Sequence, residues 1–277
     1  MILAGGIYVK TLFFDYYMQI DYADVVSRCN YTIKCIPQSN MRQSINRISI
    51  DMFPRTDYLW GIDGLKNRQI YGVNEEAHST FHFRISGEAC TGLADYEEIE
   101  DDSMTMIFRH AHGLNVAGER IRAYFHQLEG GLNNVCDSYE KALLLMHRLH
   151  RDYQYQANCT NINTTAEEAF TLGRGVCQDY AHIFISLLHL AGVPARYVTG
   201  LLIGEGASHA WVEILSNGKW YGLDPTNDVP VLDNHIKIGI GRDAGDCMIN
   251  RGIMHGGGLH TQKIKVIVKE SQVRKYD

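Results

Sequence analysis

The residues best suited to chemistry in this 277-residue chain are Cys177, His209 and Asp224. Their types and order predict a thiol nucleophile, the base that activates it and an acid that orients the base. Each has a simpler explanation when taken alone: an inert buried cysteine, a packed histidine and a turn-forming aspartate before Pro225. The three together are far less expected by chance, so they are the predicted catalytic residues.

Cys177 stands just before a strongly apolar run, residues 180–191. The run is apolar nearly all round, which predicts a buried helix, and Gly192 and Pro194 mark its end. Cys177 would then lie at the helix N-terminus, where unpaired backbone N–H groups and the helix dipole favour an anion. This position favours a thiolate, and the same N–H groups could hold the oxyanion that forms when a carbonyl is attacked.

The dipeptide Asn217-Gly218 predicts a two-residue hairpin turn between two strand-like segments. In the register that this turn sets, Trp211 faces Asp224, and His209 and Asp224 project from the same face as diagonal neighbours. Diagonal Cβ atoms lie roughly 7–8 Å apart, close enough for an imidazole and a carboxylate to meet. The hairpin therefore predicts a hydrogen bond between His209 and Asp224, which a one-residue slip would prevent.

The sequence around these residues resembles the transglutaminase-like superfamily over roughly residues 100–270. The similarity is densest in Gly175-Val176-Cys177, in His209-Ala210-Trp211-Val212-Glu213 and in Leu223-Asp224-Pro225-Thr226, and it extends to 192–200 and to Gly241-Arg242-Asp243. Where relatives often read Gly-Arg-Asp-Tyr followed by Asp-Val-Pro-Pro, this chain continues after Asp243 with Ala244-Gly245-Asp246-Cys247.

The resemblance implies a papain-like α+β core in which Cys177 is the nucleophile, His209 the general base and acid, and Asp224 the residue that orients His209. Members of the superfamily form a thioester with an amide substrate and then pass the acyl group to an amine or to water. By family habit, hydrolysis of a protein or peptide amide is favoured over cross-linking for this chain.

We expect an α+β fold in two parts, an N-terminal antiparallel β-rich domain at 1–97 and a transglutaminase-like catalytic core at 98–277. Strand-like runs at 8–20, 31–36, 44–53 and 78–85 predict the first part. It also resembles the N-terminal domain often fused to bacterial members of the superfamily. The acidic stretch 97–102 predicts a solvated linker between the parts.

The expected core carries clear signals for helix starts and ends. In chain order they are a helix at 119–128 closed by Gly130-Gly131, a helix at 138–153 with the capping box Asp137/Glu140, a helix start with the capping box Thr165/Glu168, and a terminal strand at 264–269.

Composition narrows the partners and the compartment. A net charge of −6 and a pI near 6.1 argue against nucleic acid or anionic lipid as the main partner. No apolar run approaches the ~20 residues of a membrane span, and the N-terminus lacks the basic start of a signal peptide. Seven scattered cysteines without a C-x-x-C pair favour a reducing cytoplasm and predict neither a zinc site nor a cofactor.

The other conspicuous side chains are given structural roles. His182 is expected in the core, and the pairs His110/His112 and His147/His150 are expected to be ordinary histidines rather than metal ligands. The remaining assignments are Glu213 as a solvated strand residue that could instead meet Arg174 or Arg196, Trp211 as cleft wall or core packing, and 256–258 as a mobile glycine turn.

The sequence favours a cytoplasmic thiol enzyme that acts on an amide of a protein or peptide. Two other classes stay open: a non-catalytic protein-binding module that keeps the fold, and a metal-dependent hydrolase that uses the histidines. The oligomeric state is not determined by the sequence.

Overall fold

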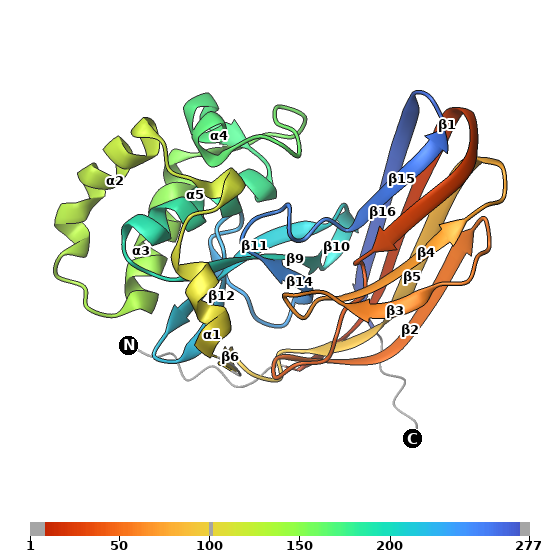
Figure 1. The fold of residues 1–277 in the computed structure, drawn as a ribbon. Coiled ribbons are helices and arrows are strands. Elements are labelled where there is room, and N and C mark those ends of the chain that lie inside the picture. Colours follow the sequence, from red (N-terminus) through yellow and green to blue (C-terminus); the bar gives the residue numbers. More distant parts are fainter. Residues whose placement is uncertain (1–8, 100–101, 272–277) are drawn as a thin grey trace, which may run out of the picture.

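The computed structural model of the protein describes residues 9–99 and 102–271. Figure 1 shows three layers: a group of helices on one side, a six-stranded sheet in the middle and an eight-stranded sheet on the other side. Helices and antiparallel sheets are both major components, so the predicted α+β fold is confirmed.

The eight-stranded sheet is organised around one very long strand, β1 (Lys10–Ile33). Its first half pairs with β5 (His78–Thr91) and β16 (His260–Glu270), and its second half pairs with β4 (Arg68–Asn74) and β15 (Asn250–Gly256). The other strands are β2 (Gln43–Phe53), β3 (Leu59–Ile62) and β10 (Gly204–Gly206). The strands predicted at 44–53 and 78–85 are confirmed, whereas β1 runs far beyond residue 20 and β3 and β4 were not predicted.

The chain returns to this first sheet at its C-terminal end. The predicted strand at 264–269 is part of β16, which pairs with β1 from Leu12↔Glu270 to Tyr22↔His260. The glycines 256–258 join β15 to β16, and all three have positive φ angles. The domain boundary between residues 97 and 98 stays a prediction. Strands β15 and β16 follow that boundary in the sequence, yet they belong to the same sheet as β1.

The helical layer consists of α2 (Glu119–Leu132), α3 (Ser138–Asp152), α4 (Ala166–Leu172) and α5 (Cys177–Leu190), preceded by α1 (Asp102–Thr105) and the short 3₁₀ turns η1 (Met106–Arg109) and η2 (Gly113–Asn115). The predicted N-caps are present: Asp137 accepts hydrogen bonds from two N–H groups of α3, and Thr165 and Glu168 cap each other at α4.

The helices test two expectations from the sequence, the end of α2 and the absence of a membrane span. The end predicted for α2 at Gly130-Gly131 is wrong, because the helix continues through both glycines to Leu132. Among residues 9–99 and 102–271, no helix has the length and apolar composition needed to cross a bilayer.

The middle sheet has the strand order β13-β12-β11-β9-β14, with β6 on β12. Its strands are β6 (Tyr96–Glu98), β9 (Ala195–Leu202), β11 (His209–Ser216), β12 (Lys219–Asp224), β13 (Val229–Pro230) and β14 (His235–Gly241). Ala210, Val212 and Ile214 of β11 pack in the same core as α5. Because side chains alternate along a strand, His209, Trp211 and Glu213 lie on the opposite face.

The acidic stretch expected to be a solvated linker is ordered at its start. Glu97 lies in β6, opposite Trp220 of β12, and forms ion pairs with Arg196 and Lys237. The linker prediction is therefore wrong for Glu97, because nearby cations bind the carboxylate in place of water. Residues 100 and 101 of the stretch lie outside the described residues.

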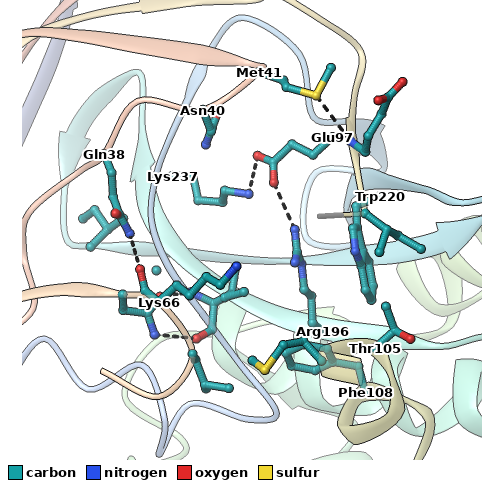
Figure 2. A pocket seen from close by; sticks show the side chains of 18 of the residues that line it. Gln38, Asn40, Met41, Lys66, Glu97, Thr105, Phe108, Arg196, Trp220 and Lys237 are labelled. Carbon is teal, nitrogen blue, oxygen red and sulfur yellow. Dashed lines mark hydrogen bonds and ion pairs between the residues drawn. The ribbon is translucent and has the colours of Figure 1, made fainter. Parts of the chain in front are cut away.

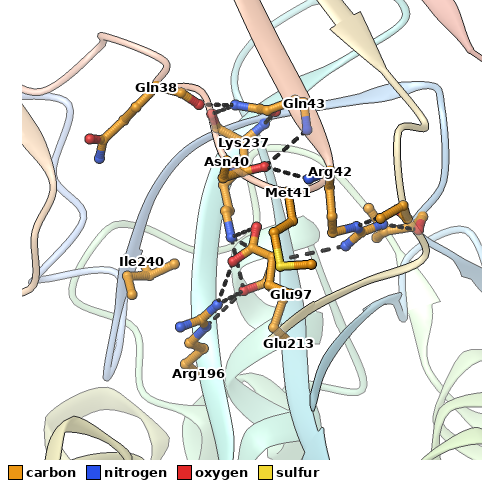
Figure 3. Close-up of polar contacts among 12 residues, drawn as sticks. Gln38, Asn40, Met41, Arg42, Gln43, Glu97, Arg196, Glu213, Lys237 and Ile240 are labelled. Carbon is orange, nitrogen blue, oxygen red and sulfur yellow. Dashed lines mark hydrogen bonds and ion pairs between the residues drawn. The ribbon is translucent and has the colours of Figure 1, made fainter. Parts of the chain in front are cut away.

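The prediction that Glu213 is solvated is also wrong. Its side chain is 1% exposed and contacts Arg196 Nη2 at 2.6 Å and Lys237 Nζ at 3.0 Å, with Arg42 Nη1 at 3.9 Å (Figure 3). Burial by itself would raise the pKa of Glu213, but the three cations outweigh it and lower this pKa to about 2. The network joins β9, β11 and β14 to the segment before β2 and to β6.

We expect Glu213→Gln to lower the free energy of unfolding at pH 7 by about 3–5 kcal/mol, because it leaves buried cations without their partner. The folded-state pKa lies below the ordinary value of 4.5, so the carboxylate stabilises the fold fully above pH 4.5. That contribution disappears as the pH falls from 4.5 towards 2. Urea denaturation of both proteins between pH 7 and pH 3.5 measures the difference.

Glu75→Gln serves as the control for this comparison, since the Arg28–Glu75 pair is mostly exposed and should contribute little. A pH-independent difference between wild type and Glu213→Gln would contradict the proposed role of the buried charge.

Candidate active site

Cys177 is the first residue of α5, with Val176 as the N-cap, so the predicted position at a helix N-terminus is confirmed. The start of the helix is fixed by Asp179, whose Oδ2 accepts hydrogen bonds from Val176 N and Thr160 Oγ1, both at 2.7 Å. Residues 179–188 of α5 are buried, while Cys177 itself is partly exposed. The thiol therefore stands on a rigid, buried helix and still reaches solvent.

The backbone before Cys177 passes through a crowded site. A Cβ atom on Gly175 would lie 2.5 Å from both Asp179 Oδ2 and Tyr153 Oη, so this position requires glycine. Gly175 pairs with Tyr155 of the short strand β7 (Gln154–Tyr155), through β8 (Arg174–Gly175). Burial and the Cys177 sulfur raise the pKa of the Tyr155 hydroxyl.

The hairpin forms in the predicted register. Pairs run from Ser216↔Lys219 to Val212↔Leu223, and Asn217 and Gly218 have φ angles of 50° and 75°. His209 Nε2 lies 2.7 Å from Asp224 Oδ2, so the predicted hydrogen bond is present. A turn encoded by two residues thus sets the contact between two side chains that are 15 positions apart.

The Asp224 carboxylate is fully buried and densely hydrogen-bonded. Its Oδ1 accepts from the backbone N–H groups of Thr226 at 3.0 Å and Asn227 at 3.3 Å, which is an Asx turn. Its Oδ2 meets His209 Nε2, Asn227 Nδ2 at 2.7 Å and His235 Nε2 at 3.1 Å. These donors fix the orientation of the acid before it meets the His209 ring.

The charges of the site form an ion pair. Burial by itself would lower the pKa of His209, but hydrogen bonds to Asp224 and to Cys177 outweigh burial and raise it to about 10. Burial would raise the pKa of Asp224, yet the hydrogen bonds from His209 and His235 hold it well below its ordinary value. The structure thus joins His209 directly to Asp224, and the Cys177 sulfur is near enough to contribute to the raised pKa of His209.

His235 is the member of the site that the sequence did not reveal. It begins β14, two strands away from β11 in the sheet, and its side chain is 4% exposed. Burial lowers its pKa, with the Asp224 hydrogen bond opposing, so the ring is neutral at pH 7. The only sequence signal is a polar residue opening an apolar strand, because the contact depends on the pairing of β14 with β9.

The space around the two histidines is filled by Trp211. Its ring is 1% exposed and lies 5.2 Å from the His235 ring and 6.3 Å from the His209 ring, between centroids. A Cβ atom on Gly200 would come within 2.3 Å of the Trp211 ring, so the glycine makes room for it. Trp211 therefore has the packing role and braces both imidazoles.

His209, Asp224 and His235 also offer a ligand set that suits zinc, with donor atoms within 4.8 Å of one another. Two ligands of one tetrahedral zinc ion at about 2.0–2.1 Å would stand roughly 3.3 Å apart, wider than the 2.7 Å between His209 and Asp224. Metal binding through Nε2 would put the proton of His235 on Nδ1, which has no partner among the described residues. The geometry therefore suits a hydrogen-bonded carboxylate better.

The other histidines have structural contacts. His182 is fully buried and accepts a hydrogen bond from Ala244 N at 3.1 Å, so its predicted place in the core is confirmed. In the two pairs considered for metal binding, His112 contacts Asp243 at 3.2 Å and His147 contacts Asp228 at 2.5 Å.

The cavity in Figure 2 has a volume of about 440 Å³ and lies away from the site. Arg196, Lys237, Glu97, Trp220 and Phe108 are among its lining residues, and none of the three predicted catalytic residues is. The Arg196 guanidinium stacks 4.2 Å from the Trp220 ring centroid, so it already has aromatic and acidic partners.

The family model described as the transglutaminase-like superfamily matches residues 126–225. This segment is similar to a transglutaminase-like core. It contains Cys177, His209 and Asp224, whereas His235 lies beyond the matched residues. The resemblance inferred from the short sequence blocks is confirmed for this segment.

Two uncharacterized mycobacterial proteins are similar to part of the chain. The one from Mycobacterium leprae is 39% identical over 114 residues, which cover 38% of this chain and 40% of the relative. The one from Mycobacterium tuberculosis strain H37Rv is 36% identical over 127 residues, which cover 40% of each protein. The matched segment thus spans about two fifths of these relatives.

The fold is shared over a greater length. A Cytophaga hutchinsonii structure described as a "Putative Cysteine Protease" aligns with a TM-score of 0.77 and 19% sequence identity. The alignment covers 95% of this chain and 91% of that one. The helical layer, the middle sheet and the sheet built on β1 therefore occur together in another solved structure.

We expect Asp224→Asn to lower the pKa of His209 well below about 10, because the carboxylate would no longer oppose burial and only Cys177 would still do so. A ¹⁵N-histidine NMR titration measures this change directly. The buried His182, whose pKa of about 4 is set mainly by burial, provides the internal control. An unchanged His209 titration in the variant would contradict the ion pair.

Proposed function

We propose that the protein is a thiol-dependent enzyme that hydrolyses an amide of a protein or peptide substrate through a Cys177 thioester. The observation that carries the proposal is the His209 imidazole, held between the Cys177 thiol and a fully buried carboxylate. An imidazolium beside a sulfur at a helix N-terminus is the environment that maintains a reactive thiolate. Asp224 selects the tautomer that presents Nδ1 of His209 to the sulfur.

The mechanism follows from these positions. The Cys177 thiolate attacks the amide carbonyl carbon, and the carbonyl oxygen takes the displaced electron pair. The N–H groups of Cys177 and Gln178, in the first turn of α5, have no acceptor within the helix and could stabilise that oxyanion. His209 gives its proton to the leaving amine as the C–N bond breaks, which leaves a thioester.

Water completes the cycle in the proposed hydrolysis. His209 takes a proton from water as the water oxygen attacks the thioester carbon, and the C–S bond breaks to release a carboxylic acid and restore the thiol. Attack by an amine instead of water would give acyl transfer at the same site. The seven unpaired cysteines support the expected reducing compartment, because they would be prone to oxidation elsewhere.

We expect Cys177 to react with iodoacetamide faster at pH 6 than an ordinary exposed thiol, because the neighbouring His209 can take the thiol proton. His209→Ala should slow this reaction at pH 6 by at least about tenfold. Mass spectrometry of the Cys177 peptide follows the rate, and the exposed Cys136 in the same sample gives the reference for an ordinary thiol. Equal pH profiles for both cysteines in wild type would favour the non-catalytic binding module.

The choice between water and an amine is tested with a glutamine-containing protein and a labelled primary amine. Hydrolysis predicts ammonia or new peptide termini with little label incorporated, and the Cys177→Ala variant should produce neither. Label incorporation that exceeds hydrolysis would make the protein an acyltransferase. Activity that survives Cys177→Ala and is lost to a chelator would identify a metal-dependent hydrolase instead.

A further inference from the structure

His235 is a buried histidine whose only polar contact among the described residues is with Asp224. Its Nε2 lies 3.1 Å from Asp224 Oδ2, and its Nδ1 has no hydrogen-bond partner among residues 9–99 and 102–271. His78, His182 and His189 also leave one buried ring nitrogen without a partner among the described residues, so the free Nδ1 alone does not distinguish His235. What distinguishes it is that its other nitrogen contacts the acid of the candidate active site.

The contact has a defined direction. Asp224 is a carboxylate with a strongly lowered pKa, so its Oδ2 can only accept hydrogen bonds. His235 is neutral, and it must therefore carry its single proton on Nε2 and donate it to Oδ2. The same oxygen receives the Nε2–H of His209, which makes the two imidazoles competing donors to one atom.

The geometry points to His235 as a positioning residue for the proposed thiol enzyme: it donates a hydrogen bond to Asp224 Oδ2 and so weakens this oxygen as an acceptor for His209. This inference rests on the proposed function for its catalytic meaning. Asn227 and the backbone N–H groups also hold Asp224, so the acid stays in place when His235 is replaced. Removal of His235 then leaves a stronger acceptor for the His209 proton.

Few titratable groups face His209, so a change in its pKa can be assigned to one of them. Cys177 approaches from α5, Asp224 from β12 and His235 from β14, and Arg42 acts on His235 from the segment before β2. Replacing Cys177 by alanine removes the sulfur from this set. The titration of His209 in that background then reports Asp224 and its donors alone.

The test compares two replacements of His235 in the Cys177→Ala protein by ¹⁵N-histidine NMR titration. His235→Phe keeps a ring against Trp211 but removes the donor, and we expect His209 to titrate upwards by about one pH unit. His235→Gln restores a donor at the position of Nε2, and we expect the His209 titration to return close to its original value. His182→Phe, which removes a buried imidazole that contacts Ala244 and Tyr197 and not Asp224, should destabilise the fold without moving the His209 titration.

Each outcome decides the inference. An unchanged or lowered His209 titration in a folded His235→Phe protein would overturn it, and so would a failure of His235→Gln to reverse the shift. Adding Zn²⁺ gives a separate check, because binding that perturbs the His209 and His235 signals and requires His235 would replace the hydrogen-bonding role by a metal site. The measurement needs no enzymatic activity, so failure of the proposed function is detected separately, by the iodoacetamide profile of Cys177.

Discussion

The Asp224 carboxylate is the interaction on which the candidate site depends. A buried carboxylate is costly unless its oxygens are hydrogen-bonded, and this one accepts from two backbone N–H groups, one amide and two imidazoles. The donors come from β11, β14 and the turn after β12, so the acid is satisfied only when the middle sheet is assembled. The site and the sheet are thus stable for the same reason.

A second set of buried charges lies on the same face of β11. Glu213 is four residues beyond His209, and its ion pairs reach β9, β14 and the segment before β2. Two of the same cations also pair with Glu97 of β6. Strands β11 and β14, which carry His209 and His235, are therefore tied through charges as well as through the backbone ladder. Because a buried ion pair is sensitive to the loss of one partner, this arrangement favours a single register.

Helix α5 contributes a residue to the candidate site, whereas the N-terminal sheet only supports it. Helix α5 contributes directly, since its start places Cys177 at the edge where β11 begins and its buried length resists movement. The sheet built on β1 packs against Leu201 and Ile236, the neighbours of Gly200 and His235 in β9 and β14. It thereby supports the far side of the site without contributing any of its three predicted residues.

Sequence signals within a few residues were enough to predict the hairpin of the candidate site and the end of α5. The turn Asn217-Gly218 fixed the hairpin register, and Gly192 with Pro194 marked the end of α5, because both act within a few residues. Signals failed where distant contacts decided the outcome: Glu97 and Glu213 look solvated in the sequence, and only the assembled sheet brings Arg196 and Lys237 to them.

By itself, the sequence determined the pairing of His209 with Asp224, since a two-residue turn sets the register of the hairpin that carries them. It also predicted Cys177, at the start of a buried helix, as the third residue of the candidate site. Tertiary structure alone decided that His235 shares the acid and that the C-terminal strands join β1. The physical reason is that strand pairing across hundreds of residues is chosen by burial and hydrogen bonding in the whole fold, which no local pattern encodes.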